Sequence, residues 1–185
     1  MKKNNFKVLR GGIHSTFQDD GYDHAQHLGI STGGVADQDS FKLANKIVNN
    51  ELNCPVLEFS IQGPHLKLQK GKCRFVITGN VMFNVIQEKK IIKGVPNHSY
   101  ILNEGDVLDI LATIKSNYGY LAVEGGFSIE KYRDCASTLT QSKLGPNRGE
   151  KILEGQFINF NLNGSNVNSS LKNHLFNFND NIIRV

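Results

Sequence analysis

Apolar and polar residues alternate with a period of two along most of the chain. The segment 57–61 (LEFSI) places Leu, Phe and Ile on one side and Glu and Ser on the other, and 66–69 repeats the pattern with two leucines. Such alternation is typical of half-buried strands, because successive side chains of a strand point to opposite faces. Similar runs, separated by Gly, Asn or Pro turns, occupy 73–77, 81–87, 107–112, 118–123 and 157–160. Regularly spaced short strands predict a mainly β fold, either a barrel or a sandwich.

One segment follows the helical period instead. Over about 38–49, Phe41, Ala44 and Val48 fall on one face, and Asp37 stands where a helix N-cap is expected. The predicted fold is therefore mainly β with one packed helix and short extra helical turns. Two further segments, 101–110 and 152–160, share an apolar pair, an acidic-Gly turn and an alternating strand, and we interpret them as equivalent hairpins.

Length and local composition predict the domain organisation. A chain of 185 residues is long enough for one domain with a sizeable core. We assign residues 1–162 to the β domain and the polar, Asn-rich segment 163–180 to a linker. Residues 181–185 (NIIRV) begin an alternating apolar pattern, so we interpret them as the start of a further strand of a missing C-terminal part.

Charge and composition narrow the classes of function. The net charge is only +4 and the lysines are scattered, which argues against nucleic acid as a partner. No apolar run approaches the roughly 20 residues of a membrane span, and no secretory signal follows the basic start, so we expect no membrane association and a cytoplasmic location. The three cysteines are odd in number and lack a CxxC spacing, which predicts reduced thiols.

The stretch 11–34, GGIHSTFQDDGYDHAQHLGISTGG, carries the densest candidate chemistry. Its HxxH, His24 and His27, lacks the helical i, i+4 spacing of zinc sites, so we predict no metal site. Its glycines permit the positive φ angles of a backbone anion nest, and the helix that Asp37 opens would also favour an anion. The alternative is that the glycines only make turns and that Asp37 only caps the helix.

Motifs along nearly the whole chain resemble the KipA-like family, also called allophanate hydrolase subunit 2 or the C subunit of 5-oxoprolinase. The family pattern GPxTTxQDxGRxGxxxxGVxxGGxxD is matched within 11–37, and LEFSIQGPHLKL and YGYLAVEGGF resemble two later motifs. The segment ASTLTQSKLGPNRGEKILEGQ resembles a fourth. The residues carried over from the first pattern and its helix are Gly12, Ser15, Thr16, Gln18, Asp19, Gly21, Gly29, Gly34, Asp37, Ala44, Asn45 and Asn50.

The resemblance implies a cyclophilin-like β-barrel and an enzyme built from several subunits. The leading expectation is the C subunit of an ATP-dependent 5-oxoprolinase, inactive alone, that helps a KipI-like B subunit and a LamB/YcsF-like A subunit open 5-oxoproline to L-glutamate. ATP with Mg²⁺ would act in the assembled complex, with no cofactor bound to this chain alone. The alternatives are the carboxyltransferase component of a urea carboxylase or allophanate-type system, and a non-catalytic regulatory module that binds a KipI-like partner.

The resemblance also implies site residues, each of which has a purely structural alternative. Glu58 could only pair with a lysine, Asn45 could only satisfy backbone groups, and the 125–126 glycine pair could only turn the chain. The expected catalytic residues are Gln18, Asp19 and Glu58. The expected substrate-binding or anion-binding residues are Gly29, Gly34, Asp37, Asn45, Gly125, Gly126, Ser137, Thr138 and Arg148.

Three positions depart from the family pattern. Tyr22, Ala136 and Glu150 stand where the family usually has Arg. A guanidinium binds carboxylate or phosphate through two parallel hydrogen bonds, which none of these side chains can replace. The departures favour the non-catalytic alternative unless Arg148, two positions before Glu150, compensates.

Overall fold

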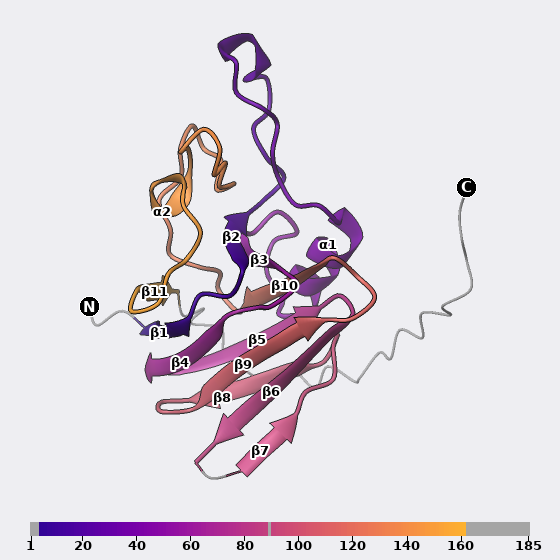
Figure 1. Cartoon of the computed structure of the whole chain (residues 1–185), viewed down its shortest axis with the longest axis vertical. Helices are drawn as coiled ribbons and strands as arrows, with labels where there is room; N and C mark the ends of the chain where they lie inside the picture. The colour runs from indigo at the N-terminus through magenta and orange to yellow at the C-terminus, as the bar shows by residue number, and fades with distance from the viewer. Residues whose placement is uncertain (1–3, 89, 162–185) are drawn as a thin grey trace.

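The protein is mainly β in the part that the computed structural model describes, residues 4–88 and 90–161 (Figure 1). Two antiparallel sheets and one helix make up most of this part, so the predicted fold class is confirmed, while the closed cyclophilin-like barrel stays a prediction. The predicted linker 163–180 and strand start 181–185 lie outside the described residues. No helix within residues 4–88 and 90–161 combines the length and apolar character that crossing a bilayer requires.

Two sheets contain all the strands of the described residues, and every pairing within them is antiparallel. In spatial order the six-stranded sheet consists of β11 (Phe157–Phe160), β1 (Asn4–Arg10), β4 (His65–Lys70), β9 (Val107–Thr113), β6 (Val81–Gln87) and β7 (Lys90–Lys93). The five-stranded sheet consists of β2 (His14–Gln18), β3 (Val56–Ser60), β10 (Tyr118–Val123), β5 (Lys72–Thr78) and β8 (Ser99–Asn103).

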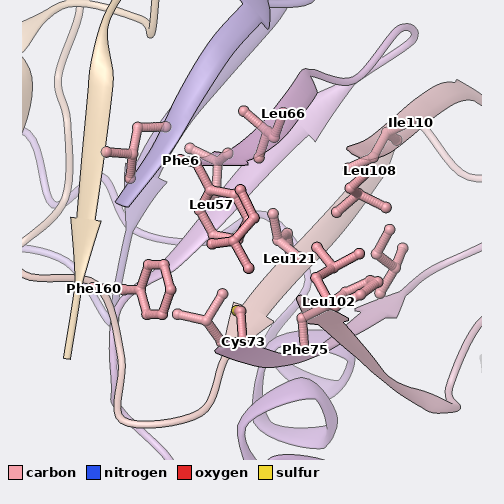
Figure 2. Packing of buried hydrophobic residues seen from close by; sticks show 14 of the residues in the cluster. Phe6, Leu57, Leu66, Cys73, Phe75, Leu102, Leu108, Ile110, Leu121 and Phe160 are labelled. Carbon is pink, nitrogen blue, oxygen red and sulfur yellow. The ribbon is translucent and has the colours of Figure 1, made fainter. Parts of the chain in front are cut away.

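The main core lies between the two sheets. Phe6 and Leu66 from the six-stranded sheet meet Leu57, Phe75 and Leu121 from the five-stranded sheet, and all five side chains are fully buried (Figure 2). These residues occupy the apolar positions of the period-two pattern, so the alternation in the sequence identifies the face that each strand buries. Burial of this apolar surface is the main force that holds the sheets together.

Helix α1 (Gln38–Ile47) covers the outer face of the five-stranded sheet, where it packs against β10 and β5 (Figure 1). Asp37 caps its N-terminus by accepting hydrogen bonds from two backbone N–H groups, as predicted. Phe41, Ala44 and Val48 are fully buried, which confirms the predicted helical face. The helix ends before the expected residue 49 because Asn49 has a left-handed backbone, with φ of 60°. Short helical turns, also predicted, form η1 (Gln26–Leu28) and α2 (Pro146–Gly149).

Two details of the strand prediction are wrong. Ile61 does not face the core: β3 ends at Ser60, and Ile61 is 61% exposed with φ of 61°. Glu58 does not face solvent, because α1 and the segment before it cover the outer face of the sheet, and the side chain is only 6% exposed. The period-two pattern therefore predicts the strand, but it does not show that α1 and the segment before it cover the outer face of the sheet.

The two acidic-Gly segments are equivalent, as predicted, but they are not hairpins. Strands β8 and β9 belong to different sheets, so the turn between them crosses from one sheet to the other. The Gly105 N–H donates to the Leu68 carbonyl, and the Gly155 N–H donates to the Val8 carbonyl, both at 2.9 Å or less. Leu68 and Val8 each donate back to the residue after that glycine. Each turn thus docks on a strand of the six-stranded sheet in the same way.

Candidate functional site

The glycine-rich loop between β2 and α1 extends away from the sheets (Figure 1). Its two arms are joined at the base by a hydrogen bond of 2.7 Å from the Tyr22 N–H to the Thr32 carbonyl and one of 3.0 Å from Val35 to Asp19. Gly34 makes this close approach possible, since a Cβ there would lie 2.8 Å from a backbone oxygen of the opposite arm, and its φ is 88°. The glycines of this stretch therefore shape a narrow neck.

The tip of the loop carries the predicted histidines and one predicted binding residue. His24 and His27 are exposed, and within the described residues no group of three or more His, Cys, Asp or Glu side chains is placed to hold a metal ion. Gly29 closes the short helix η1 in a left-handed conformation, and its N–H donates to the Gln26 carbonyl. Gly29 is therefore the C-cap of η1 at the tip of the loop, and its role differs from that of the residues at the neck.

Asp19 anchors the neck to the segment after residue 134. Its Oδ1 accepts hydrogen bonds from Ser137 Oγ at 2.6 Å, Gly21 N at 3.0 Å and Cys135 Sγ at 3.2 Å. Its Oδ2 accepts one from Ala136 N at 2.6 Å, and the residue is 8% exposed. Four donors around a buried carboxylate give it a structural task, because charge-assisted hydrogen bonds are among the strongest polar contacts in a protein.

Two of the positions where the family has arginine lie inside this cluster. The Tyr22 side chain is 2% exposed, and its hydroxyl donates to the Ser137 carbonyl at 2.9 Å. Burial, with further contributions from Cys135 and Asp19, raises the pKa of Tyr22 to about 12. Ala136 is fully buried, and its backbone N–H holds the Asp19 carboxylate. In this chain both residues are therefore part of the buried interior of the protein.

The third departure and the proposed compensating arginine lie at the surface. Glu150 forms an exposed ion pair of 2.7 Å with Lys143, and this hydrogen bond lowers the pKa of Glu150. Arg148 is exposed in the irregular turn α2, with φ of 58°. Neither residue lines a cavity among those seen in the described part of the chain.

A cavity of about 200 Å³ lies on one side of the neck, beside Tyr22, Arg133 and Cys135. Burial is the main reason why the pKa of the Cys135 thiol rises to about 11. The thiol donates to Asp19 and accepts from the Ser137 N–H at 3.3 Å, so both of its hydrogen-bonding roles are filled. A neutral, fully bonded thiol is a poor nucleophile.

A second cavity, of about 210 Å³, lies between the neck and a neighbouring turn. It is lined by Gln18 at the end of β2, by Ser31, by the glycines 33–34, and by the turn 138–142. All these side chains are uncharged. Two deeply buried atoms of its lining residues, Gln18 Oε1 and Thr138 Oγ1, have no hydrogen-bond partner within residues 4–88 and 90–161. Buried polar atoms without partners are uncommon in folded proteins.

Glu58 and Asp37 meet at the start of α1 and not at this cavity. Glu58 Oε2 accepts a hydrogen bond of 2.8 Å from the Ala36 N–H, and the Asp37 N–H donates to the Tyr120 hydroxyl at 2.8 Å. Desolvation raises the pKa of Glu58, and hydrogen bonding to Ala36 and Tyr120 partly opposes this rise. Together the two acidic residues fix the chain where it leaves the neck and enters the helix.

Asn45 and the 125–126 glycine pair form a third group, at the C-terminal end of α1. The fully buried Asn45 donates to the Cys54 carbonyl at 2.7 Å and accepts from Asn50 at 3.2 Å. The Gly125 N–H donates to Asn50 Oδ1 at 2.9 Å, and the Gly126 N–H donates to a backbone carbonyl at 3.0 Å. Because both glycine N–H groups are already bonded, they are not available to an anion in this conformation.

The predicted site residues therefore separate into distinct places. Only Gln18, Gly34 and Thr138 share a cavity, and Asp19 and Ser137 brace the wall behind it. Sequence reasoning missed the rest of that wall, the turn 139–142. A signal for it was present, because a polar run lies between two leucines, Leu139 and Leu144, whose backbones pair in the structure. The predicted residues that lie elsewhere are Gly29, Asp37, Asn45, Glu58, Gly125, Gly126 and Arg148.

Fold and cavity together define a mainly β domain with a small polar site at the base of a glycine loop. Over residues 28–184 the sequence matches the family described as "Carboxyltransferase domain, subdomain A and B", and the chain belongs to this family. The chain is 29% identical over 157 residues to the urea amidolyase of Lachancea kluyveri, covering 84% of this chain and 8% of that protein. It is 26% identical over 148 residues to the 5-oxoprolinase C subunit of Haemophilus influenzae, covering 80% and 47%.

A solved structure agrees with these relatives. The K. lactis urea amidolyase matches with a TM-score of 0.80 at 26% identity, over 88% of this chain and 10% of that chain. The KipA-like resemblance predicted from the motifs is thereby confirmed. The chain spans about half the length of the 5-oxoprolinase C subunit that it matches, 47%, and only a small part of urea amidolyase.

Proposed function

We propose that this chain acts within the C subunit of an ATP-dependent 5-oxoprolinase, and that it supplies part of the site where 5-oxoproline is opened to L-glutamate. The cavity between Gln18 and Thr138 is the observation that carries the proposal. Similarity to the 5-oxoprolinase C subunit of Haemophilus influenzae supports it. The partners in this proposal are a KipI-like B subunit and a LamB/YcsF-like A subunit.

In this reaction the main task of the protein is to position the substrate, and acid–base catalysis is less important. A lactam resists hydrolysis because its amide is resonance-stabilised, and transfer of the ATP γ-phosphoryl group to the amide oxygen makes the ring carbon electrophilic. Holding a small substrate in a fixed orientation for such a transfer is itself a large part of catalysis. The braced wall formed by Asp19 and Ser137 gives the Gln18–Thr138 cavity the rigidity that this task requires.

The residues of the cavity do not fit ATP itself. Its lining side chains are uncharged, and the 125–126 glycine pair that was expected to bind an anion has both N–H groups engaged elsewhere. Phosphate sites in proteins usually combine free backbone N–H groups with Lys or Arg. In the proposed complex ATP and Mg²⁺ therefore bind chiefly to residues of the other subunits.

Glutamate release tests the proposal. The purified KipI-like and LamB/YcsF-like subunits of a 5-oxoprolinase are mixed with the longest naturally encoded form of this chain, 5-oxoproline and ATP, and each component is omitted in turn. We expect glutamate only in the complete mixture. Association with the KipI-like subunit without turnover above the mixture that lacks this chain would contradict the enzymatic proposal and favour a non-catalytic module.

A second candidate is the carboxyltransferase component of a urea carboxylase-type system. The family match and the 29% identity to urea amidolyase favour it. Urea is also a small uncharged amide, so the cavity alone does not separate the two. The assay that separates them replaces 5-oxoproline with urea and adds a biotin carrier and its carboxylase, and it measures urea-dependent ATP hydrolysis.

A further inference from the structure

We propose that the outer face of the six-stranded sheet binds an acidic, partly apolar surface of another protein. In the proposed enzyme this protein is the KipI-like B subunit, so the choice of partner rests on the proposed function. The inference goes further, because it assigns the surface of this chain that makes the contact, the side chains that recognise the partner and the charge that the partner surface carries.

The register of the strands aligns one residue of each strand in a row across this sheet. From one edge strand to the other, this outer row consists of Phe157, Lys7, Lys67, Val107, Ile86 and Ile91. The residues next to them along the strands, among them Phe6, Leu66 and Leu108, belong to the core between the sheets. Because side chains alternate along a strand, the outer row points away from the core. With strands about 4.8 Å apart, the row spans roughly 24 Å.

Apolar side chains at both ends of the outer row are exposed to solvent. Phe157 is 59% exposed and Ile91 is 64% exposed. Val107 and Ile86 continue the apolar surface inward from Ile91, and both are partly exposed. Helix α1 packs against β10 and β5 of the other sheet, so it leaves this face uncovered. Single exposed apolar residues are ordinary, but several in one row, with an aromatic residue among them, are typical of a protein-binding surface.

Two lysines lie side by side at the centre of the outer row without a carboxylate partner. Lys7 and Lys67 are directly opposite each other on β1 and β4, and neither forms an ion pair within residues 4–88 and 90–161. Asp109, on the same face of β9, is already paired with Arg10 at 2.8 Å. Like charges directly opposite each other destabilise a sheet. Carboxylates of a partner placed between the two ammonium groups would replace this repulsion with attraction.

The sign of the charge distinguishes the possible partners of this face. A second copy of the chain that docked through the same face would bring the same lysines, and the two copies would repel each other. Residues 162–185 carry two cations, Lys172 and Arg184, against one carboxylate, Asp180, so this segment also has the wrong sign. An acidic surface of a different protein is therefore the complementary partner.

Calorimetric titration of the longest naturally encoded form of this chain with a purified KipI-like subunit tests the inference. Lys67→Glu and Phe157→Ser should each raise the Kd about tenfold, because they remove the central charge and the exposed aromatic ring of the row. Lys67→Glu places a carboxylate opposite Lys7, so it should not destabilise the sheet, and weaker binding cannot then be attributed to unfolding. Lys42→Glu is the matched control, since Lys42 is exposed on α1 at the other sheet, and it should leave the Kd within about twofold.

The salt dependence of binding gives a second readout. Raising the salt concentration from about 50 to about 300 mM should raise the Kd of the unchanged chain severalfold, because the Debye length shortens. Lys67→Glu should show a smaller salt dependence, whereas Lys42→Glu should keep that of the unchanged chain.

The inference would be overturned if the unchanged chain did not bind the KipI-like subunit, or if either Lys67→Glu or Phe157→Ser left the Kd within about twofold. Self-association of the chain that Phe157→Ser abolishes in sedimentation velocity would also overturn it, because the face would then join two copies. None of the residues of the outer row lines the cavity beside Gln18, so docking and turnover can be measured separately. Docking that both substitutions weaken, without glutamate release in the complete mixture, would count against the proposed function alone.

Discussion

Asp19→Asn should strongly destabilise the protein although it changes only one atom. In the less costly orientation the new amide nitrogen replaces Oδ2 and faces the Ala136 N–H, so that one hydrogen bond of 2.6 Å is lost. The three donors on Oδ1 then bind a neutral oxygen instead of a charged one. A lost charged hydrogen bond costs about 1.5–3 kcal/mol and each weakened one about 0.5–1 kcal/mol, which together give roughly 4 kcal/mol.

Thermal and urea denaturation of the two proteins measures this loss. For a chain of this size roughly 4 kcal/mol corresponds to a fall in Tm of about 8–16 °C. Asp20→Asn is the control, because Asp20 is exposed and should change stability by less than about 0.5 kcal/mol. If Asp19→Asn matched Asp20→Asn in stability yet abolished glutamate release, Asp19 would be an acid–base group and not an anchor.

Three further substitutions probe the surrounding structure. Burial raises the pKa of Glu58, so the folded protein holds this proton more tightly than the unfolded chain and loses stability as pH rises from 4.5 through the raised pKa. Glu58→Gln should remove this pH-dependent loss. Denaturation at several pH values measures it, and a pH profile that the substitution leaves unchanged would contradict the interpretation. Gly34→Ala should lower the free energy of unfolding by roughly 3 kcal/mol, because its Cβ would clash with the opposite arm of the loop. Gly29→Ala should lower it by only about 1 kcal/mol, because the space around Gly29 is open. Equal losses on urea denaturation would refute the close approach at the neck. Burial raises the pKa of the Cys135 thiol to about 11, so iodoacetamide at pH 8 should label this thiol far more slowly in the native protein than in urea. Rapid native labelling would show that the thiol is not held by its neighbours.

Strands and the helix were predictable because local pattern determines them. The bounds of β6, β10 and β11 agree with the alternating runs, and Asp37 marked the start of α1 as a capping residue should. The pattern carries no information on which sheet a strand joins, so the turn between β8 and β9 was interpreted as a hairpin. The burial of Glu58 was missed for a similar reason, because it depends on a layer added by another segment.

The site was less predictable, since its contacts join residues that are distant in sequence. The sequence and the family resemblance selected both Asp19 and Gln18 without distinguishing their tasks. Asp19 is engaged by Ser137, which lies 118 positions away, whereas Gln18 keeps one oxygen without a partner among the described residues. Which polar side chain anchors the fold, and which lines the cavity, depends on this tertiary pairing and on the turn 139–142.

A crystal structure of the chain bound to its KipI-like partner and 5-oxoproline tests the central claim most directly. We predict that the lactam lies in the cavity that Gln18, Thr138 and the turn 139–142 line. A lactam bound elsewhere would contradict the assignment of this cavity to the substrate.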